Sequence, residues 1–106
     1  MKEIKAVIAP QRLAALNDAL RAVPGFAGMT VSRAEGYPTT APRVRNAIRA
    51  ELTDHVPRVR VEMVAPDEAA GALYDALVAF LSSGPRGDGL VWVTDVERAT
   101  FVHKTS

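Results

Sequence analysis

The sequence predicts an α+β fold in which the elements follow the order strand, helix, strand, strand, helix, strand. Apolar residues alternate with polar ones in short segments rich in β-branched residues, and they recur at helical spacing in two longer segments. A proline opens each helical segment, at a position where its missing N–H costs nothing. This order is the ferredoxin-like βαββαβ plan, an antiparallel four-stranded sheet with two helices on one face.

The first half of the chain supplies a strand, a helix and a second strand. The first strand is expected over residues 3–9, and Pro10 then opens a helix that runs to about Val23. The second strand is expected over residues 28–35 and leaves through Gly36. The apolar residues of the helix fall at helical spacing, and they are Leu13, Leu16, Leu20 and Val23.

The second half repeats the pattern. The third strand is expected over residues 59–65, where apolar side chains alternate. Pro66, Asp67 and Glu68 begin the second helix, because the two carboxylates complement the positive end of the helix dipole. Residues 90–94 form the fourth strand. The second helix is expected to bury Ala70, Leu73, Leu77, Phe80 and Leu81.

Both faces of the predicted sheet carry apolar side chains. Val7 and Ala9 point away from the Ile4, Ala6 and Ile8 side of the first strand, and Leu90 and Trp92 point away from Val91 and Val93 in the fourth. Two helices cover only one face, so copies of the same chain are expected to cover the other in a closed oligomer. The alternative is a monomer with apolar residues on an open face.

Composition describes one globular domain over residues 1–106, with 48% hydrophobic and 24% charged residues. The formal net charge of +1 gives no field that would favour nucleic acid or an anionic membrane. There is no cysteine, which excludes disulfides and thiolate metal sites. The apolar run near the N-terminus is too short for a signal peptide, so a cytoplasmic protein without membrane insertion is expected.

A turn of glycines, residues 84–89, separates the second helix from the fourth strand. Gly84, Gly87 and Gly89 carry no Cβ, so successive N–H groups could converge on an anion such as a phosphate oxygen. The alternative is a simple connection between a helix and a strand, since glycine commonly follows helices. Composition alone leaves both interpretations open.

Residues 37–57 form a long connection, which inside a compact domain usually binds, covers a site or is disordered. Apolar residues recur every four positions in its second half, so that part could form a helix on docking. The alternative is a solvated loop whose basic residues are balanced by Glu51 and Asp54. The candidate partner-binding residues are Arg43, Arg45, Ile48 and Arg49.

No catalytic or metal-binding motif stands out. The sequence contains no nucleophile with an identifiable base and no P-loop combination, so a non-enzyme is expected. His55 and His103 have no recognised ligand spacing, and no metal site is expected. Asp67 and Glu68 are better explained by the helix start than by acid and base chemistry.

Five segments in the correct order resemble the PII signal-transduction family, over about residues 1–99. These segments are the opening residues 1–8 with Pro10, the second strand from Gly28 to Val31, the pair Gly36 and Tyr37, residues 57–67, and residues 84–93. The resemblance implies a homotrimer that binds adenine nucleotides in clefts between subunits. It also implies that residues 37–57 are an effector loop that controls a protein partner. Residues from about 97 to 106 are expected to form a C-terminal tail.

The resemblance carries a set of nucleotide-binding residues over to this chain. The basic residues nearest in sequence to the family's charged contact positions are Arg86 and Arg98. The positions that match the family pattern are Thr30, Gly36, Val64, Gly87, Asp88 and Gly89.

The family's charged contacts are depleted in this chain. Pro85 and Leu90 stand where the family usually has lysines, and Phe101 and His103 stand where it usually has arginines. Each lost charge-assisted contact is worth about 1.5–3 kcal/mol, so ADP or AMP is expected to bind and ATP only weakly. Another small anion is an open alternative. No tyrosine lies in the middle of the loop, so control by uridylylation is not expected.

The leading hypothesis is a signalling trimer that senses a small ligand and transmits occupancy to a protein target, which could be a membrane transporter or an enzyme. The alternative is an interaction module that has lost nucleotide binding and serves a metal-efflux or inorganic-carbon system. A metal-handling trimer of the related copper-tolerance fold is disfavoured because cysteine is absent.

Overall fold

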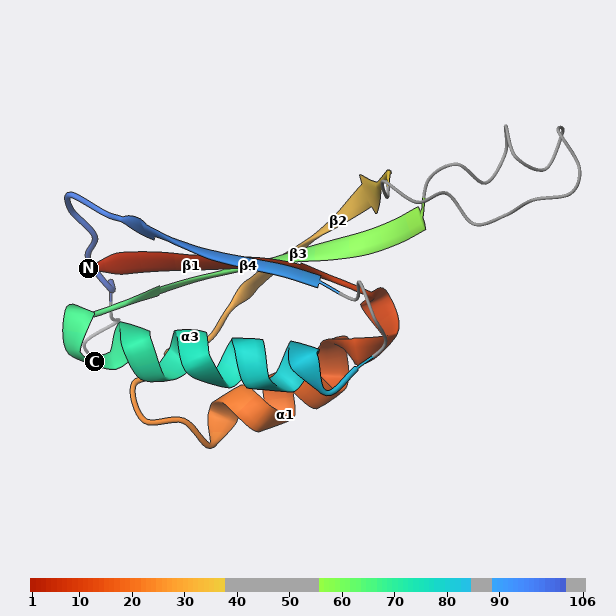
Figure 1. Ribbon diagram of the computed structural model, residues 1–106. Coiled ribbons are helices and arrows are strands. Elements are labelled where there is room, and N and C mark those ends of the chain that lie inside the picture. Colours follow the sequence, from red (N-terminus) through yellow and green to blue (C-terminus); the bar gives the residue numbers. More distant parts are fainter. Residues whose placement is uncertain (38–55, 85–88, 103–106) are drawn as a thin grey trace, which may run out of the picture.

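The computed structural model describes residues 1–37, 56–84 and 89–102 (Figure 1). The glycine-turn residues 85–88 and most of the predicted loop, residues 38–55, lie outside this part of the chain. The elements are β1 (Lys2–Ile8), η1 (Pro10–Arg12), α1 (Leu13–Arg21), β2 (Thr30–Gly36), β3 (Val56–Ala65), α3 (Asp67–Ser82) and β4 (Gly89–Asp95).

The strands form one sheet in the order β2-β3-β1-β4, and every neighbouring pair is antiparallel. In the middle of the sheet, Ile4 of β1 lies opposite Met63 of β3 and Val93 of β4. Strands β1 and β3 are therefore central, and β2 and β4 are the edges. The predicted ferredoxin-like α+β fold is confirmed.

Helices α1 and α3 lie on the same side of the sheet (Figure 1). Their apolar stripes and the facing residues of β1 and β3 form one core. No helix in the described part of the chain is long and apolar enough to cross a bilayer. The most deeply buried large side chains are Ile4, Ile8, Leu16, Leu20, Leu73, Leu77 and Val61.

The largest differences from the predicted boundaries lie in the first helix and in the starts of β2 and β3. The helix expected from Pro10 begins with the 3-10 turn η1, in which the Arg12 amide donates to Ala9 O at 3.1 Å, and α1 then ends at Arg21. Strand β2 begins at Thr30 because Gly28, with a φ of 103°, turns the chain before it. Strand β3 begins earlier than predicted, since Val56 pairs with Gly36.

Contacts between distant segments fix both ends of α3. At its start, the ammonium of Met1 donates to Asp67 Oδ1 at 2.8 Å. This hydrogen bond, with the charge of the same ammonium, lowers the pKa of the Asp67 carboxyl. At its end, Arg12 Nη2 donates to Phe80 O at 3.0 Å and its guanidinium lies 4.3 Å from the centroid of the Phe80 ring. The residues leading into the glycine turn are thereby tied to η1.

Candidate functional site

The face of the sheet opposite the helices is partly apolar. Directly paired residues of a sheet point to the same side, so Val7 shares this open face with Leu90, and Lys5 shares it with Trp92. Leu90 is 62% exposed, which is high for a leucine on a sheet. As the sequence predicted, the strands present apolar side chains on both sides. The helices cover only the other side (Figure 1).

Charged residues share the open face. Glu62 of β3 lies opposite Lys5 of β1, and Val64 lies opposite Glu3. Lys5 Nζ lies 3.5 Å from Glu3 Oε1, and both side chains are more than two-thirds buried, with exposures of 29% and 28%. The open face therefore combines an apolar region around Trp92 with a compensated charged region around Lys5.

A pocket of about 410 Å³ lies at one end of this face, and we call it the Phe101 pocket. Gly28, with its positive φ, turns the chain just before β2. Met29 and the first residue of β2, Thr30, then line the pocket. Of the predicted nucleotide-binding residues, Thr30 and Val64 line this pocket. The complete lining is Glu3, Ala27, Gly28, Met29, Thr30, Glu62, Met63, Val64 and Phe101.

Sequence reasoning missed Glu3 and Glu62 as lining residues. The signal that could have found them is strand alternation, because Glu62 is two residues from Val64 and therefore lies on the same face. Glu3 needed the pairing register as well, since it reaches the pocket as the partner of Val64 across β1 and β3.

Gly36 and Gly89 lie away from the Phe101 pocket. Gly89 starts β4 opposite Ile8, whereas Thr30 shares a row of the sheet with Trp92. Gly89 is thus three residues along the strands and three strands across from Thr30, which corresponds to roughly 17 Å between Cα atoms. Gly36 ends β2, six residues beyond Thr30. A single copy of the chain does not bring these predicted residues together.

The remaining predicted residues have different positions. Arg98 is exposed in the segment after β4 and does not line the Phe101 pocket. Arg86, Gly87 and Asp88 lie outside the described residues, as do the loop residues Arg43, Arg45, Ile48 and Arg49 and the histidines His55 and His103. Among residues 1–37, 56–84 and 89–102, no group of three or more His, Cys, Asp or Glu side chains could hold a metal ion.

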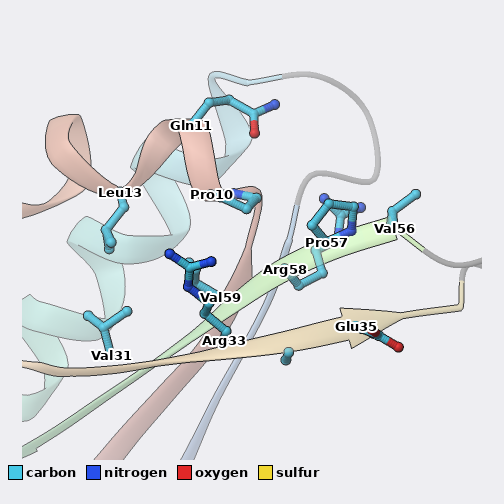
Figure 2. Close-up of a pocket in the computed structure, with 11 residues that line it drawn as sticks. Pro10, Gln11, Leu13, Val31, Arg33, Glu35, Val56, Pro57, Arg58 and Val59 are labelled. Carbon is cyan, nitrogen blue, oxygen red and sulfur yellow. The ribbon is translucent and has the colours of Figure 1, made fainter.

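A larger groove of about 1440 Å³ lies on the helix side, between the start of α1 and the β2–β3 ribbon (Figure 2). The Arg33 side chain extends from β2 into the groove, in the direction of the helix that carries Leu13 (Figure 2). Apolar Val31 and Val59 form part of its lining, and none of the predicted nucleotide-binding residues does. The groove exists because β2 projects beyond the helices, which no local sequence pattern indicates (Figure 1).

Comparison with known proteins finds one family and several relatives that are similar to this chain. The sequence model of the family described as nitrogen regulatory protein P-II matches residues 1–106. The chain is 34% identical over 99 residues to nitrogen regulatory protein P-II 1 of Escherichia coli K12, covering 92% of this chain and 88% of that protein.

Two further relatives are similar over nearly the same span. Nitrogen regulatory protein P-II of Rhizobium meliloti is 37% identical over 98 residues, covering 92% of this chain and 87% of that protein. The protein of the same name from Haemophilus influenzae is 33% identical over 100 residues, with coverages of 93% and 88%. The family model spans all of the strands and helices described above.

Proposed function

This chain belongs to the nitrogen regulatory protein P-II family, and we propose that it is a signal-transduction regulator, not an enzyme, that senses a small ligand and controls a protein partner. The proposed ligand is an adenine nucleotide such as ADP or AMP, with ATP bound more weakly. The proposed assembly is a cytoplasmic homotrimer whose ligand sites lie in the clefts between subunits. Each chain acts in it as one domain over residues 1–106.

The separation of the predicted binding residues within one chain carries this proposal. Thr30 and Val64 line the Phe101 pocket, while Gly89 lies at the far edge strand. A complete site needs a second copy, in which the Gly89 end of one chain meets the Phe101 pocket of its neighbour. The partly apolar open face supplies a surface that association would bury.

The path from ligand to partner runs through the β2–β3 ribbon. Gly36 and Val56 pair at its end, so the predicted loop of residues 37–57 starts directly after β2, and its last two residues, Val56 and Pro57, already belong to β3. We propose that this loop is the effector loop and that its arginines, Arg43, Arg45 and Arg49, contact the partner. Ligand occupancy beside Gly36 would bias the loop between conformations that do and do not bind the partner.

The composition of the Phe101 pocket favours one second candidate, an interaction module that has lost nucleotide binding. Phe101, Glu3 and Glu62 line the pocket, and the resemblance implies an arginine at the position of Phe101. Such a module would act through the loop alone, as an accessory of a metal-efflux or inorganic-carbon system.

Calorimetry of the purified protein with ATP, ADP, AMP, cyclic nucleotides and bicarbonate separates the two candidates. The sensor predicts heat with ADP or AMP that is lost in Gly87→Ala. If no compound gives heat or a thermal shift, the sensor is excluded and the interaction module stands.

Light scattering tests the assembly independently, because the proposed trimer has three times the chain mass of 11.4 kDa.

A further inference from the structure

We propose that the groove between the start of α1 and the β2–β3 ribbon docks a segment of the protein partner that carries carboxylates beside apolar side chains. We call it the Arg33 groove, and the lining residues on which the proposal depends are Leu13, Val31, Arg33 and Val59. This inference rests on the proposed function, because it takes a protein as the partner. It adds a contact surface to the loop and states the chemistry of the segment that would fit there.

The floor of the Arg33 groove is apolar and partly exposed. Arg33 lies opposite Val59 in the pairing of β2 with β3, so it is on the helix side of the ribbon together with Val31. Val59 is buried in the core, whereas Val31 is 39% exposed. Leu13 packs against the same core from α1. Apolar side chains of a partner would therefore bury surface that water contacts in the single chain.

Arg33 supplies a positive charge over this floor. Figure 2 shows its side chain reaching from β2 into the groove. Among residues 1–37, 56–84 and 89–102, no ion pair or side-chain hydrogen bond involves Arg33. Glu35 is the one carboxylate among the described lining residues, and it takes part in an interaction of its own. The Arg33 guanidinium is therefore available to a ligand, and its planar fork of donors matches a carboxylate.

The sequence concentrates positive charge on the ribbon and on the loop that the ribbon carries. Residues 33–60 contain six basic residues against three acidic ones, whereas the other 78 residues contain seven basic and nine acidic ones. All six of these basic residues are arginines. Arginine forms paired hydrogen bonds with carboxylates and is enriched at protein interfaces. The partner surface with the complementary charge is acidic.

The position of the Arg33 groove suits contact with a partner of the proposed trimer. The groove is on the helix side of the ribbon, whereas the proposed trimer buries the opposite face of the sheet. Val56 lines the groove and pairs with Gly36, at the point where the predicted loop leaves β2. A partner held by the loop arginines is therefore adjacent to the groove, which extends the same contact surface.

Nucleic acid fits the Arg33 groove less well than an acidic protein segment does. A nucleic-acid backbone offers phosphates along the whole contact, and the apolar floor formed by Val31 and Val59 gives phosphate no partner. The formal net charge of +1 also provides little long-range attraction for a polyanion. A protein segment can match both the charge of Arg33 and the apolar floor.

The probe is a library of short random peptides displayed on phage and selected for binding to the full chain. The selected peptides are expected to place two or more aspartates or glutamates beside apolar residues. The tightest of them is then synthesised with a fluorescent label, and anisotropy gives its dissociation constant for each variant. Arg33→Glu should weaken binding at least about tenfold, a difference of about 1.4 kcal/mol, because it replaces the partner of the carboxylate with a repelling charge.

Val31→Thr tests the apolar floor without changing the charge. Threonine keeps the branched shape and the strand preference of valine but places a hydroxyl in the groove, so binding should weaken about threefold or more. A peptide that bound only the loop arginines would not respond to this change.

Arg21→Glu is the matched control for Arg33→Glu. Arg21 is exposed at the end of α1 and does not line the groove, so the variant makes the same change of charge away from the proposed contact. It should change the affinity for the peptide less than about twofold, because solvent and salt screen distant charges. Melting temperatures of all variants identify any loss of affinity that comes from unfolding.

Three results of the selection would overturn the proposal: peptides that are basic or uncharged, a peptide that binds Arg33→Glu as tightly as the unsubstituted chain, and no selected peptide at all. A changed mass of Arg33→Glu in light scattering would overturn it by assigning the groove to contact between copies of the chain. Tighter binding of a DNA duplex than of the peptide, lost in Arg33→Glu, would overturn it in favour of nucleic acid.

Calorimetry with ADP separates this inference from the proposed ligand sensing. If the unsubstituted chain binds ADP but selects no acidic peptide, the inference fails and the proposed sensor survives. If the chain binds an acidic peptide through Arg33 but gives no heat with ADP, the inference stands and the sensor fails.

Discussion

At the scale of single residues, Gly89 packs closely against the backbone of β1 and the side chain of Leu81. The resemblance to the family implies a nucleotide-binding role for it, whereas the structure shows that a Cβ there would lie 2.9 Å from Val7 O and 3.0 Å from Leu81 Cδ1. The backbone of β1 cannot move without disturbing its ladder. Packing alone therefore requires glycine at this position, whatever the ligand is.

Gly89→Ala is expected to lower the free energy of unfolding by about 1–3 kcal/mol, because the added methyl group overpacks against the backbone. Urea denaturation measures this change. Gly71→Ala is the matched control: no atom lies within 4 Å of its added Cβ, and Gly71 is exposed in α3. The control should raise stability by about 0.5–1 kcal/mol. Equal stability of the two variants would refute the packing argument.

Asp67 predicts an acid dependence of stability. Its hydrogen bond from the Met1 ammonium lowers its folded pKa below the ordinary value of 3.8. The stabilisation is therefore fully present above pH 3.8 and is lost as the pH falls through the lower, folded pKa. Urea midpoints of the unsubstituted chain and Asp67→Asn should differ at neutral pH and converge in acid. A difference that persists unchanged at about pH 2 would contradict this assignment.

At the scale of elements, α3 is held at its carboxyl end by a residue from the other helical segment. Arg12 donates to Phe80 O and lies over the Phe80 ring, and Ser83 Oγ donates to the same carbonyl at 2.6 Å. These contacts add two side-chain donors to one carbonyl of the last turn, Phe80 O, which otherwise accepts from the Ser83 amide at 3.3 Å. The α3 terminus and the start of the glycine turn therefore depend on η1.

Arg12→Leu is expected to reduce the free energy of unfolding by about 1–2 kcal/mol, from the lost hydrogen bond and cation–π contact. Leucine preserves apolar contact with Phe80, so the loss reports the polar interactions. Gln11→Leu is the control, because Gln11 is exposed beside Arg12 and should tolerate the change. Hydrogen exchange at the end of α3 should rise in Arg12→Leu alone. Unchanged exchange there would show that η1 does not anchor the helix.

The sequence predicted every described strand and both helices because each has a strong periodic pattern. The predicted first helix was longer than α1, because Pro10 starts the 3-10 turn η1, whose Arg12 contacts α3. The Phe101 pocket could be predicted only in part. Thr30 and Val64 came from resemblance to the family, but the inclusion of Glu3 depends on pairing between β1 and β3, which no local pattern specifies.

For the whole molecule, the open face of the sheet is the surface that we propose neighbouring copies of the chain cover. Trp92 lies on it opposite Lys5. Trp92→Glu is expected to convert the proposed trimer to monomers, because it replaces an apolar side chain of the open face with a carboxylate that association would have to remove from water. Light scattering measures the mass. Val78→Glu, a similar change at an exposed residue of α3, should leave the trimer intact. A trimeric Trp92→Glu variant would contradict burial of this face.

The central claim is that two chains complete each ligand site, and complementation between two defective variants tests it most directly. Val64→Arg blocks the Phe101 pocket and Gly87→Arg alters the glycine turn, so neither homotrimer should bind AMP. Mixed trimers, refolded together in equal amounts, should regain about one quarter of the unsubstituted binding capacity, because random assembly unites two intact halves at that frequency. Mixed trimers of normal mass that regain no AMP binding would contradict the claim.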